Sequence, residues 1–394
     1  MKYYLYCPEC KSSFNDAGFS FNCPSGCNSI IKTEYSGQPV FRGSGIWRYS
    51  DYLPINSRIE YYEFPAILKS QEYSEMYGSE IYFILNGYVP DFNVRMRTCT
   101  FKELEVLASL KYSEKWRRDI TLSSVGNTAN AFIELGKYAE NVHITLFIPE
   151  EITCCMFELE RSENVTLVGV KGGYDFATNF ARIFAQKNEN VIYEGGGLNF
   201  ARRDALATMA YAFVERFGFS PDFYVQSVGS GTGVIAFFDG MKRIGMNPPS
   251  VILSQNIPFI PIVEAWNKNL ESVPYYDFDP VEKLYAKVLS NKRPLYNQRG
   301  GLKDILTETK GGALGITTEE AKIAGSEFKK IYGFELYPAA EVAMASLDKI
   351  SIEGKKVLVN ITGSGLDLLK KDYKVREIKF DYIVESEEDL EMVE

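Results

Sequence analysis

The sequence contains only one histidine, His143, among its 394 residues. This histidine lies in the mostly apolar segment Val142–Ile148, which predicts a buried strand. We therefore expect a structural role for it. Its place in a predicted buried strand argues against a histidine-based catalytic triad, and the lack of a second histidine excludes histidine-rich metal sites.

Long apolar runs and a surplus of basic residues are also missing. No run approaches the roughly 20 residues that a membrane-spanning helix needs. No basic segment followed by an apolar stretch opens the chain, as it would in a signal peptide. We therefore expect a soluble, cytoplasmic protein. The formal net charge of −9 argues against nucleic-acid binding, but it leaves room for a small anionic substrate in a locally positive pocket.

Size and composition are those of a globular protein with more than one domain. The chain is 45% hydrophobic and 24% charged, and its length predicts two or three domains. We expect its partners to be small-molecule substrates and further copies of itself in a homo-oligomer, without nucleic acid or membrane. The acidic stretch from Val384 to Glu394 supplies much of the negative charge and is expected to be a solvated terminus.

Four of the seven cysteines lie in the first 27 residues, in the pattern C-x2-C-x12-C-x3-C. They are Cys7, Cys10, Cys23 and Cys27. Paired thiolates on two short turns suit tetrahedral Zn²⁺, and four cysteine ligands leave no open position, so we expect a structural ion. The alternative is a zinc-ribbon-like module that folds against the main body with some or all thiols unmetallated. The other cysteines are expected to be packing residues: Cys99, Cys154 and Cys155.

From Ile120 onward, apolar runs alternate with helical patterns such as Asn130–Ala139 and Ala205–Phe217. Unbroken apolar strands between helices are typical of parallel sheet, and the number of runs is enough for two such sheets. The predicted strands are Ile120–Ser123, Val142–Ile148, Val165–Val170, Val191–Tyr193, Phe223–Val228, Val251–Leu253 and Lys356–Ile361.

Three loops follow predicted strands, where α/β proteins collect their ligands. The loop Ser123–Thr128 has short polar side chains before a helix and suits an anion or carboxylate, although a plain helix cap would look the same. The loop Val228–Gly233 is glycine-rich and can close backbone N–H groups around a phosphate; taken alone it is a weak signal. The loop Asn360–Leu366 could be a simple turn.

Lys102 opens a further predicted helix, in which Leu104, Leu107 and Ala108 form an inward stripe. The helix dipole disfavours a charged lysine at this end and favours the neutral amine. Most lysines in such positions are merely exposed, so this feature alone does not define a site.

Together these four segments resemble the threonine-synthase family of enzymes that depend on pyridoxal phosphate. That family has a Ser-Phe-Lys-type segment, a Ser-x-Gly-Asn-Thr loop, a glycine-rich phosphate cup and a Thr-Gly-x-Gly turn, in this order. The connector Trp47–Pro54 and the cysteine module are also similar to its N-terminal region. The resemblance implies the α/β fold of fold-type II enzymes, with two open parallel-sheet domains. The implied division is a zinc-ribbon-like module at 1–40, a large cofactor-binding domain at 41–104 and 222–394, and a small domain at 105–221.

A closer resemblance is to the sulfite-using members of this family, and it runs from the cysteine module to about Asp372. Those enzymes join O-phospho-L-serine and sulfite into L-cysteate and release phosphate. The segments that carry the closer resemblance are Thr98–Glu105, Asn199–Arg203, Ser227–Gly233 and Gln255–Pro261.

The resemblance also implies roles for individual residues. Lys102 would bind the cofactor covalently and then act as the base at the substrate Cα. The cofactor phosphate would be held by the cup of Gly229, Ser230, Gly231, Thr232 and Gly233. Asn127 would bond the ring hydroxyl of the cofactor, and Thr362 would meet its ring nitrogen. Residues for the substrate would be Ser123, Ser124 and Thr128 for its carboxylate and Arg202 or Arg203 for its phosphate.

Three alternatives stay open. The chain could act on O-phosphohomoserine with water, as threonine synthase does, or could add another nucleophile to the phosphoserine-derived intermediate. It could also keep the fold as a ligand-sensing protein, although the lysine and the phosphate cup are both present. For the pair Arg202 and Arg203, the alternative is a surface salt-bridge position.

Overall fold

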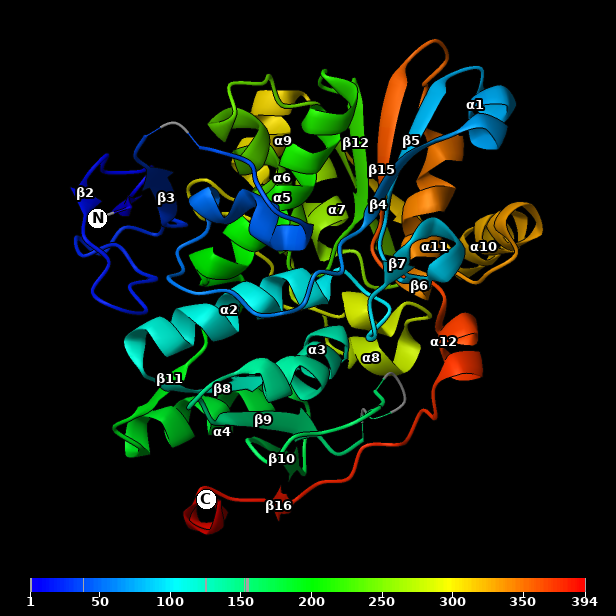
Figure 1. Ribbon diagram of the computed structural model, residues 1–394. Coiled ribbons are helices and arrows are strands. Elements are labelled where there is room, and N and C mark those ends of the chain that lie inside the picture. The colour runs from blue at the N-terminus through cyan, green and yellow to red at the C-terminus, as the bar shows by residue number, and fades with distance from the viewer. Residues whose placement is uncertain (1, 38, 125, 152, 154–155, 394) are drawn as a thin grey trace.

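The computed structural model describes residues 2–37, 39–124, 126–151, 153 and 156–393, and it contains two mainly parallel sheets (Figure 1). The larger sheet has the strand order β14-β13-β12-β15-β5-β4. Its strands are β4 (Ala66–Ser70), β5 (Glu80–Leu85), β12 (Phe223–Ser227), β13 (Ser250–Asn256), β14 (Gly312–Ile316) and β15 (Lys356–Ile361). The edge strand β4 is antiparallel to β5, and the other neighbours are parallel.

Helices cover both faces of the larger sheet, as the side-chain alternation of β5 requires. Tyr82 and Ile84 face one core, which α5 (Phe200–Phe217) and α6 (Thr232–Arg243) complete, whereas Ile81, Phe83 and Leu85 face α10 (Thr318–Tyr332) and α11 (Pro338–Ala345). Successive strand residues point to opposite faces, so a strand that is apolar throughout belongs in a sheet buried on both sides.

The smaller sheet has the order β11-β8-β9-β10-β16 and is parallel throughout. Its strands are β8 (Asp119–Ser123), β9 (Ile144–Pro149), β10 (Val165–Val170), β11 (Val191–Tyr193) and β16 (Tyr382–Val384). The helix α4 (Tyr174–Lys187) packs on one face, and α2 (Lys102–Trp116) and α3 (Asn127–Leu135) cover the other. In Figure 1, α2 and α3 lie between the two sheets.

The remaining helices and strands are shorter. The helices are α1 (Gln71–Tyr77), α7 (Pro261–Asn267), α8 (Pro280–Lys283), α9 (Leu302–Thr309) and α12 (Leu366–Asp372), and β6 (Tyr88–Val89) pairs with β7 (Val94–Arg95).

The N-terminal module, residues 2–37, is a small sheet of β1 (Tyr3–Tyr6), β2 (Ser13–Phe14) and β3 (Lys32–Tyr35) that docks on α2 and α5. Tyr112 of α2 donates a hydrogen bond to Asp16, and Phe21 packs edge-on against Phe200 of α5. Residues 2–37 thus lie together at one side of the molecule (Figure 1).

Two features differ from the domain division that the sequence predicts. The proposed boundary at 104–105 falls inside the continuous helix α2, and β16 joins the smaller sheet although 222–394 is assigned to the large domain. Apart from these two features, the division stays a prediction.

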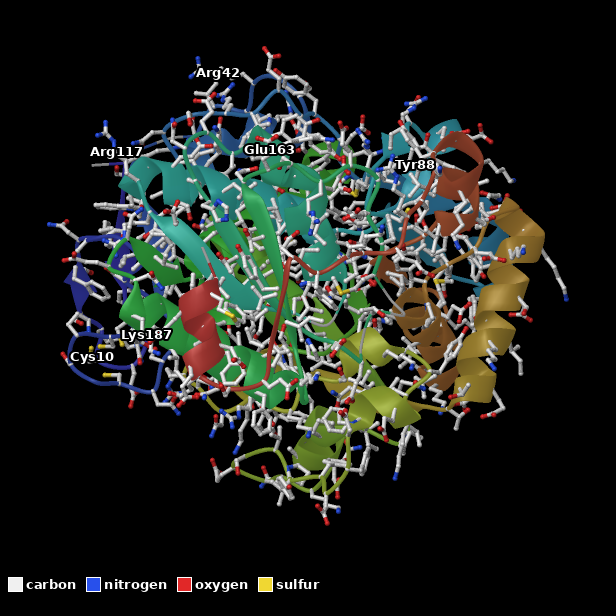
Figure 2. All side chains as sticks on the ribbon, turned by 90° about the horizontal axis from the view of Figure 1, so that it is seen from below. Cys10, Arg42, Tyr88, Arg117, Glu163 and Lys187 are labelled. Atoms are coloured by element: carbon white, nitrogen blue, oxygen red, sulfur yellow. The ribbon has the colours of Figure 1, made fainter. Side chains whose placement is uncertain are left out.

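The expectation of a solvated C-terminal tail is wrong. Val384, Leu390 and Val393 are buried against Phe180 and Phe184 of α4 because apolar residues recur among the acidic ones. Figure 2 shows the C-terminal turn beside Lys187, whose ammonium donates to the carbonyl of Glu387.

Each strand predicted from the sequence is present, with shifts of a few residues at the ends. His143 directly precedes β9, and its Nε2 lies 2.8 Å from the hydroxyl of Thr166, which fits the expected structural role. Cys99 is buried, as expected for a packing residue, whereas Cys154 and Cys155 lie outside the described residues.

Candidate active site

A pocket lies where the carboxyl ends of strands from both sheets meet the N-termini of α2, α3 and α6. Ligands collect at this edge of an α/β sheet because loops and helix N-termini converge there. The pocket is lined by Phe101, Lys102, Leu122–Ser124, Gly126–Thr128, Tyr174, Tyr193, Glu194, Gly196, Gly197, Arg202, Gln226–Gly233, Val288–Asn291, Ala339 and Thr362. Lys102, the glycine-rich loop, the Ser123 loop and Thr362 are thus brought together, although they are far apart in the sequence.

Lys102 is the first residue of α2, as the sequence predicts. Leu104, Leu107 and Ala108 are fully buried, but they do not form a single inward stripe, because every residue of α2 from Glu103 to Ser113 is buried. The helix is therefore held on all sides. The side chain of Lys102 keeps 19% of its surface exposed, and its amine lies at the pocket. An amine in this position can react with a carbonyl compound in the pocket.

The glycine-rich loop runs from the end of β12 into α6 and has the properties of a phosphate cup. Gly231 has a φ of 88°, and a Cβ there would lie 2.5 Å from the side chain of Leu302. At Gly233 a Cβ would lie 2.8 Å from the amide of Gln226. Glycine is therefore required for this turn, and the free N–H groups at the start of a helix favour an anion. The side chains of Ser230 and Thr232 are hydrogen-bonded to each other at 2.8 Å.

The polar side chains of the loop before α3 form hydrogen bonds that stabilise the loop, and they also line the pocket. Ser123 is hydrogen-bonded to Thr178 at 2.7 Å, and Ser124 accepts a hydrogen bond from the backbone N–H of Ala129 at 3.2 Å. Ser124 therefore supports the first turn of α3, and Ser123, Ser124 and Asn127 all line the pocket. Val125 lies outside the described residues.

Thr362 follows β15 and is joined directly to the start of α2. Its carbonyl oxygen accepts a hydrogen bond from the N–H of Phe101 at 3.1 Å, and its side chain lines the pocket. This contact fixes the last strand of the larger sheet beside Lys102.

The two arginines of α5 have different positions. Arg202 lines the pocket, where it forms ion pairs with Glu105 and Glu194. Arg203 points away and donates to the carbonyls of Gly197 and Ile31, so it supports the N-terminal module and does not reach the pocket. Neither side chain is exposed, so the alternative of a surface salt bridge is wrong for both.

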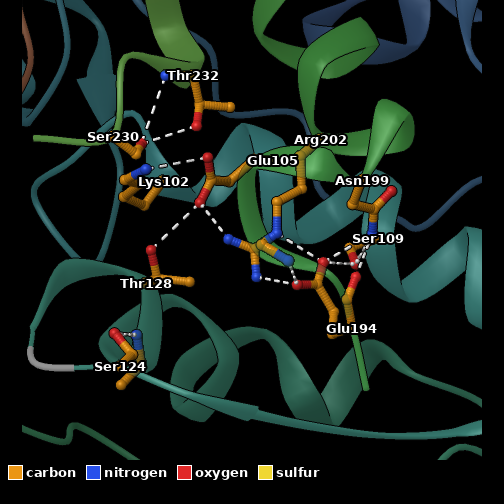
Figure 3. Close-up of polar contacts among 12 residues, drawn as sticks. Lys102, Glu105, Ser109, Ser124, Thr128, Glu194, Asn199, Arg202, Ser230 and Thr232 are labelled. Carbon is orange, nitrogen blue, oxygen red and sulfur yellow. Dashed lines mark hydrogen bonds and ion pairs between the residues drawn. The ribbon is translucent and has the colours of Figure 1, made fainter. Parts of the chain in front are cut away.

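Two buried carboxylates near Lys102 were not assigned a role from the sequence: Glu194, which lines the pocket, and Glu105, which pairs with Lys102 but does not line the pocket. Figure 3 shows Lys102, Glu105, Arg202 and Glu194 joined in a row of alternating charges. The amine of Lys102 lies 3.0 Å from Glu105, and Glu194 also accepts hydrogen bonds from Ser109 and Asn199 at 2.7 Å. Glu194 directly follows the short strand β11, and no sequence pattern marks it as a partner of Arg202.

Glu103, the residue after Lys102, is a third buried carboxylate. Burial raises the pKa of Glu103 to about 7, although hydrogen bonds from Tyr61 and from the N–H of Thr98 favour its charged form. These two bonds connect the start of α2 to Tyr61 and Thr98. Glu103 therefore holds the N-terminal end of α2, where Lys102 lies, in place.

The four cysteines of the N-terminal module form one cluster, in which all four sulfurs lie within 4.8 Å of one another. The sulfurs of Cys10 and Cys23 are 3.7 Å apart. Ligands about 2.3 Å from a tetrahedral zinc ion lie about 3.8 Å from each other, so the cluster fits Zn²⁺. A hydrogen bond with Ser12 lowers the pKa of Cys10 to about 6, whereas a hydrogen bond with Cys23 raises the pKa of Cys27 to about 12, so the fit to zinc depends on the spacing of the sulfurs. In Figure 2, Cys10 lies at the edge of the molecule.

We expect Cys7→Ser to remove most of the zinc from the purified protein and to lower the midpoint of thermal unfolding by several degrees, because Cys7 is a fully buried member of the cluster. The visible absorbance of the bound cofactor should persist, since Cys7 is outside the pocket. Metal analysis and calorimetry measure both effects. Ser25→Ala, between Cys23 and Cys27, is the control, and full zinc occupancy in Cys7→Ser would contradict the zinc assignment.

The model of the pyridoxal-phosphate dependent enzyme family matches residues 65–363. The chain therefore belongs to this family of enzymes, and the lysine, the glycine cup and Thr362 lie within the matched region. The N-terminal module lies outside it.

Curated relatives identify a narrower family within the pyridoxal-phosphate dependent enzymes. Cysteate synthase of Methanosphaerula palustris is 34% identical, with 94% of this chain and 92% of the relative covered. Cysteate synthase of Methanospirillum hungatei is 32% identical at the same coverages, and that of Methanosarcina barkeri is 33% identical with 95% of each chain covered. The chain belongs to the cysteate synthase family.

Solved structures with low sequence identity share the fold. A pyridoxal 5'-phosphate-dependent aspartate racemase superposes with a TM-score of 0.60 at 15% identity, over 78% of this chain and 92% of that chain. A fungal L-serine ammonia-lyase from Rhizomucor miehei gives 0.60 at 13% identity, over 79% and 98%. Among the described residues, no helix combines the length and apolar character that crossing a membrane requires.

Proposed function

We propose that this protein is a cysteate synthase, which converts O-phospho-L-serine and sulfite into L-cysteate and phosphate. The observation that carries the proposal is one pocket lined by Lys102, the cup Gly229–Gly233 and residues of the loop Ser123–Thr128 (the substrate loop), in a chain that belongs to the cysteate synthase family. We also propose the roles of the individual residues below.

The pocket fits pyridoxal phosphate. The backbone of Gly229, Ser230, Gly231, Thr232 and Gly233 would hold its phosphate, because the glycines leave the backbone N–H groups accessible and the N-terminus of α6 favours an anion. Lys102 would bind its carbonyl group, and Asn127 would bond its ring hydroxyl. When bound, the cofactor withdraws electrons from the substrate Cα and so permits loss of a group from Cβ.

Lys102 would hold and move the proton at the substrate Cα, since it is the one lysine that lines the pocket among the described residues. Thr362 presents a neutral hydroxyl and no carboxylate, so it stabilises a positive charge on a ring nitrogen poorly. A poorly stabilised ring charge disfavours transamination and leaves elimination of a good leaving group such as phosphate accessible.

The substrate carboxylate would bind at the start of α3, where Asn127 and Thr128 line the pocket. Ser124 accepts a hydrogen bond from the N–H of Ala129 and keeps its own hydroxyl hydrogen to donate to the carboxylate. Ser123 is bonded to Thr178, whose hydroxyl donates to the carbonyl of Tyr174, so Ser123 can donate to substrate only if its bond to Thr178 exchanges. Arg202 is the arginine in reach of the substrate phosphate, but both of its sides are paired with carboxylates, so it contributes little net positive charge.

The test is an assay of the purified protein with O-phospho-L-serine, with and without sulfite, and with O-phosphohomoserine in parallel. We expect phosphate release and a product of the mass of L-cysteate only when phosphoserine and sulfite are both present. Threonine formed from O-phosphohomoserine without sulfite would contradict the proposal and identify a threonine synthase. A product that needs another nucleophile would identify a different replacement reaction.

A further inference from the structure

Glu105 is the point where three elements around the pocket meet. Its carboxylate is fully buried and accepts from the amine of Lys102 at 3.0 Å, from the guanidinium of Arg202 at 3.0 Å and from the hydroxyl of Thr128 at 3.2 Å (Figure 3). These partners belong to α2, α5 and α3. The same carboxylate therefore contacts the reactive lysine and the helix start that would receive the substrate.

The negative charge of Glu105 is held in a fixed position by its neighbours. A buried carboxylate persists only when it is paired and hydrogen-bonded, and Glu105 has a cation on each oxygen. Arg202 is in turn held by Glu194, whose carboxylate is also fully buried and is bonded by Ser109 and Asn199. Glu194 thus holds Arg202 in place, Arg202 holds the carboxylate of Glu105, and Glu105 holds the amine of Lys102.

The same helix contains a matched pair with no access to the pocket. Lys111 and Glu114 have the same spacing of three residues and also form an ion pair, but neither lines the pocket. The spacing alone is thus an ordinary stabilising feature of a helix. What distinguishes Glu105 is its additional contact with Arg202 and Thr128.

We propose that Glu105 is a positioning residue, which holds the amine of Lys102 at the cofactor site and links it to the substrate loop through Thr128. This inference rests on the proposed role of Lys102 in cofactor binding. It extends that role because it names the group that holds the reactive nitrogen in position.

The charge of Glu105 should be visible in the spectrum of the bound cofactor. A carboxylate beside a nitrogen favours the protonated form of that nitrogen. Around the amine, the charged groups are Glu105 of α2, Arg202 of α5 and, behind it, Glu194 after β11; Tyr174 and Tyr193 are further titratable residues of the pocket. Removal of the negative charge of Glu105 leaves the cation Arg202 facing this region.

The experiment is a pH titration of the visible cofactor band in the wild type, Glu105→Gln, Glu105→Asp and the control Glu114→Gln. Glutamine keeps the size of the side chain and an acceptor for Arg202, but removes the charge. We expect the midpoint of the band to move to lower pH by about one unit in Glu105→Gln. It should stay near the wild-type value in Glu114→Gln, and Glu105→Asp should recover part of the shift.

Steady-state kinetics supply a second readout. We expect Glu105→Gln to lower kcat about tenfold or more with a KM for O-phospho-L-serine within about threefold of wild type, since Thr128 keeps an acceptor. Equal midpoints in wild type and Glu105→Gln, or equal losses in Glu105→Gln and Glu114→Gln, would overturn the proposal. If no variant and no wild-type protein shows a visible cofactor band, the proposed function fails instead.

Discussion

Replacement of Lys102 by alanine should abolish the visible absorbance of the bound cofactor and lower turnover by about a thousandfold or more. Lys102 is the one lysine that lines the pocket in the part of the chain that the structure describes, so no other amine is available there to bind the carbonyl group or move the proton. Loss of a general base alone costs roughly 10²- to 10⁴-fold in rate. Absorbance of the protein loaded with cofactor and the assay of phosphate release measure the two effects.

The matched control is Lys111→Ala on the same helix. Lys111 also pairs with a glutamate three residues later, so its loss tests the general effect of removing a lysine from α2. We expect the control to retain the cofactor band and most of the activity. Circular dichroism establishes that Lys102→Ala is folded, and turnover at the wild-type rate in this variant would refute the assignment.

Gly231→Asp should expel the cofactor. A Cβ at this position would lie 2.5 Å from Leu302, the φ of 88° disfavours most side chains, and a carboxylate would repel the cofactor phosphate from the N-terminus of α6. We expect less than about a tenth of the wild-type cofactor content after dialysis, a change equivalent to more than tenfold weaker binding. Absorbance and phosphate analysis of the denatured protein measure it.

Gly245→Asp separates the cup from general effects of the substitution. Gly245 lies just beyond the other end of α6, has a φ of 74° and faces open space, so the same residue meets backbone strain without blocking a site. We expect this variant to bind cofactor normally. If Gly231→Asp also retains its cofactor through dialysis, the phosphate must bind elsewhere.

The cofactor site could be predicted from the sequence to the extent that it depends on local backbone chemistry. Gly231 is required by the turn itself, where its φ is 88°, and the polar loop before α3 and the lysine at the start of α2 each have a local signal. We could predict that these segments meet in one pocket for two reasons. They occur in the same order in the family that the chain resembles, and the carboxyl ends of parallel strands lie at one edge of a sheet.

What the sequence did not provide are the contacts between distant segments. Glu105 lies in a quoted motif, but its role depends on Arg202, which is 97 positions away, and Arg202 depends on Glu194. The strand β14 was not predicted because it contains two glycines in five residues, which weakens its local pattern. The strand β5 was also not predicted, although Ile81–Leu85 is an unbroken apolar run, because the predicted strands began only at Ile120. Its pairing with β15, at the far end of the chain, has no local pattern.

The docking of the N-terminal module has a practical consequence for work on isolated fragments. Tyr112 and Phe200, which lie on the two helices that carry Lys102 and Arg202, are buried by the module, and Asp204 accepts hydrogen bonds from Thr33 and Tyr35. A shortened protein that begins at residue 41 would expose this apolar surface and strip two donors from a buried carboxylate. The first 40 residues thus cannot be trimmed away as an independent appendage, and crystallisation or engineering should keep the chain whole.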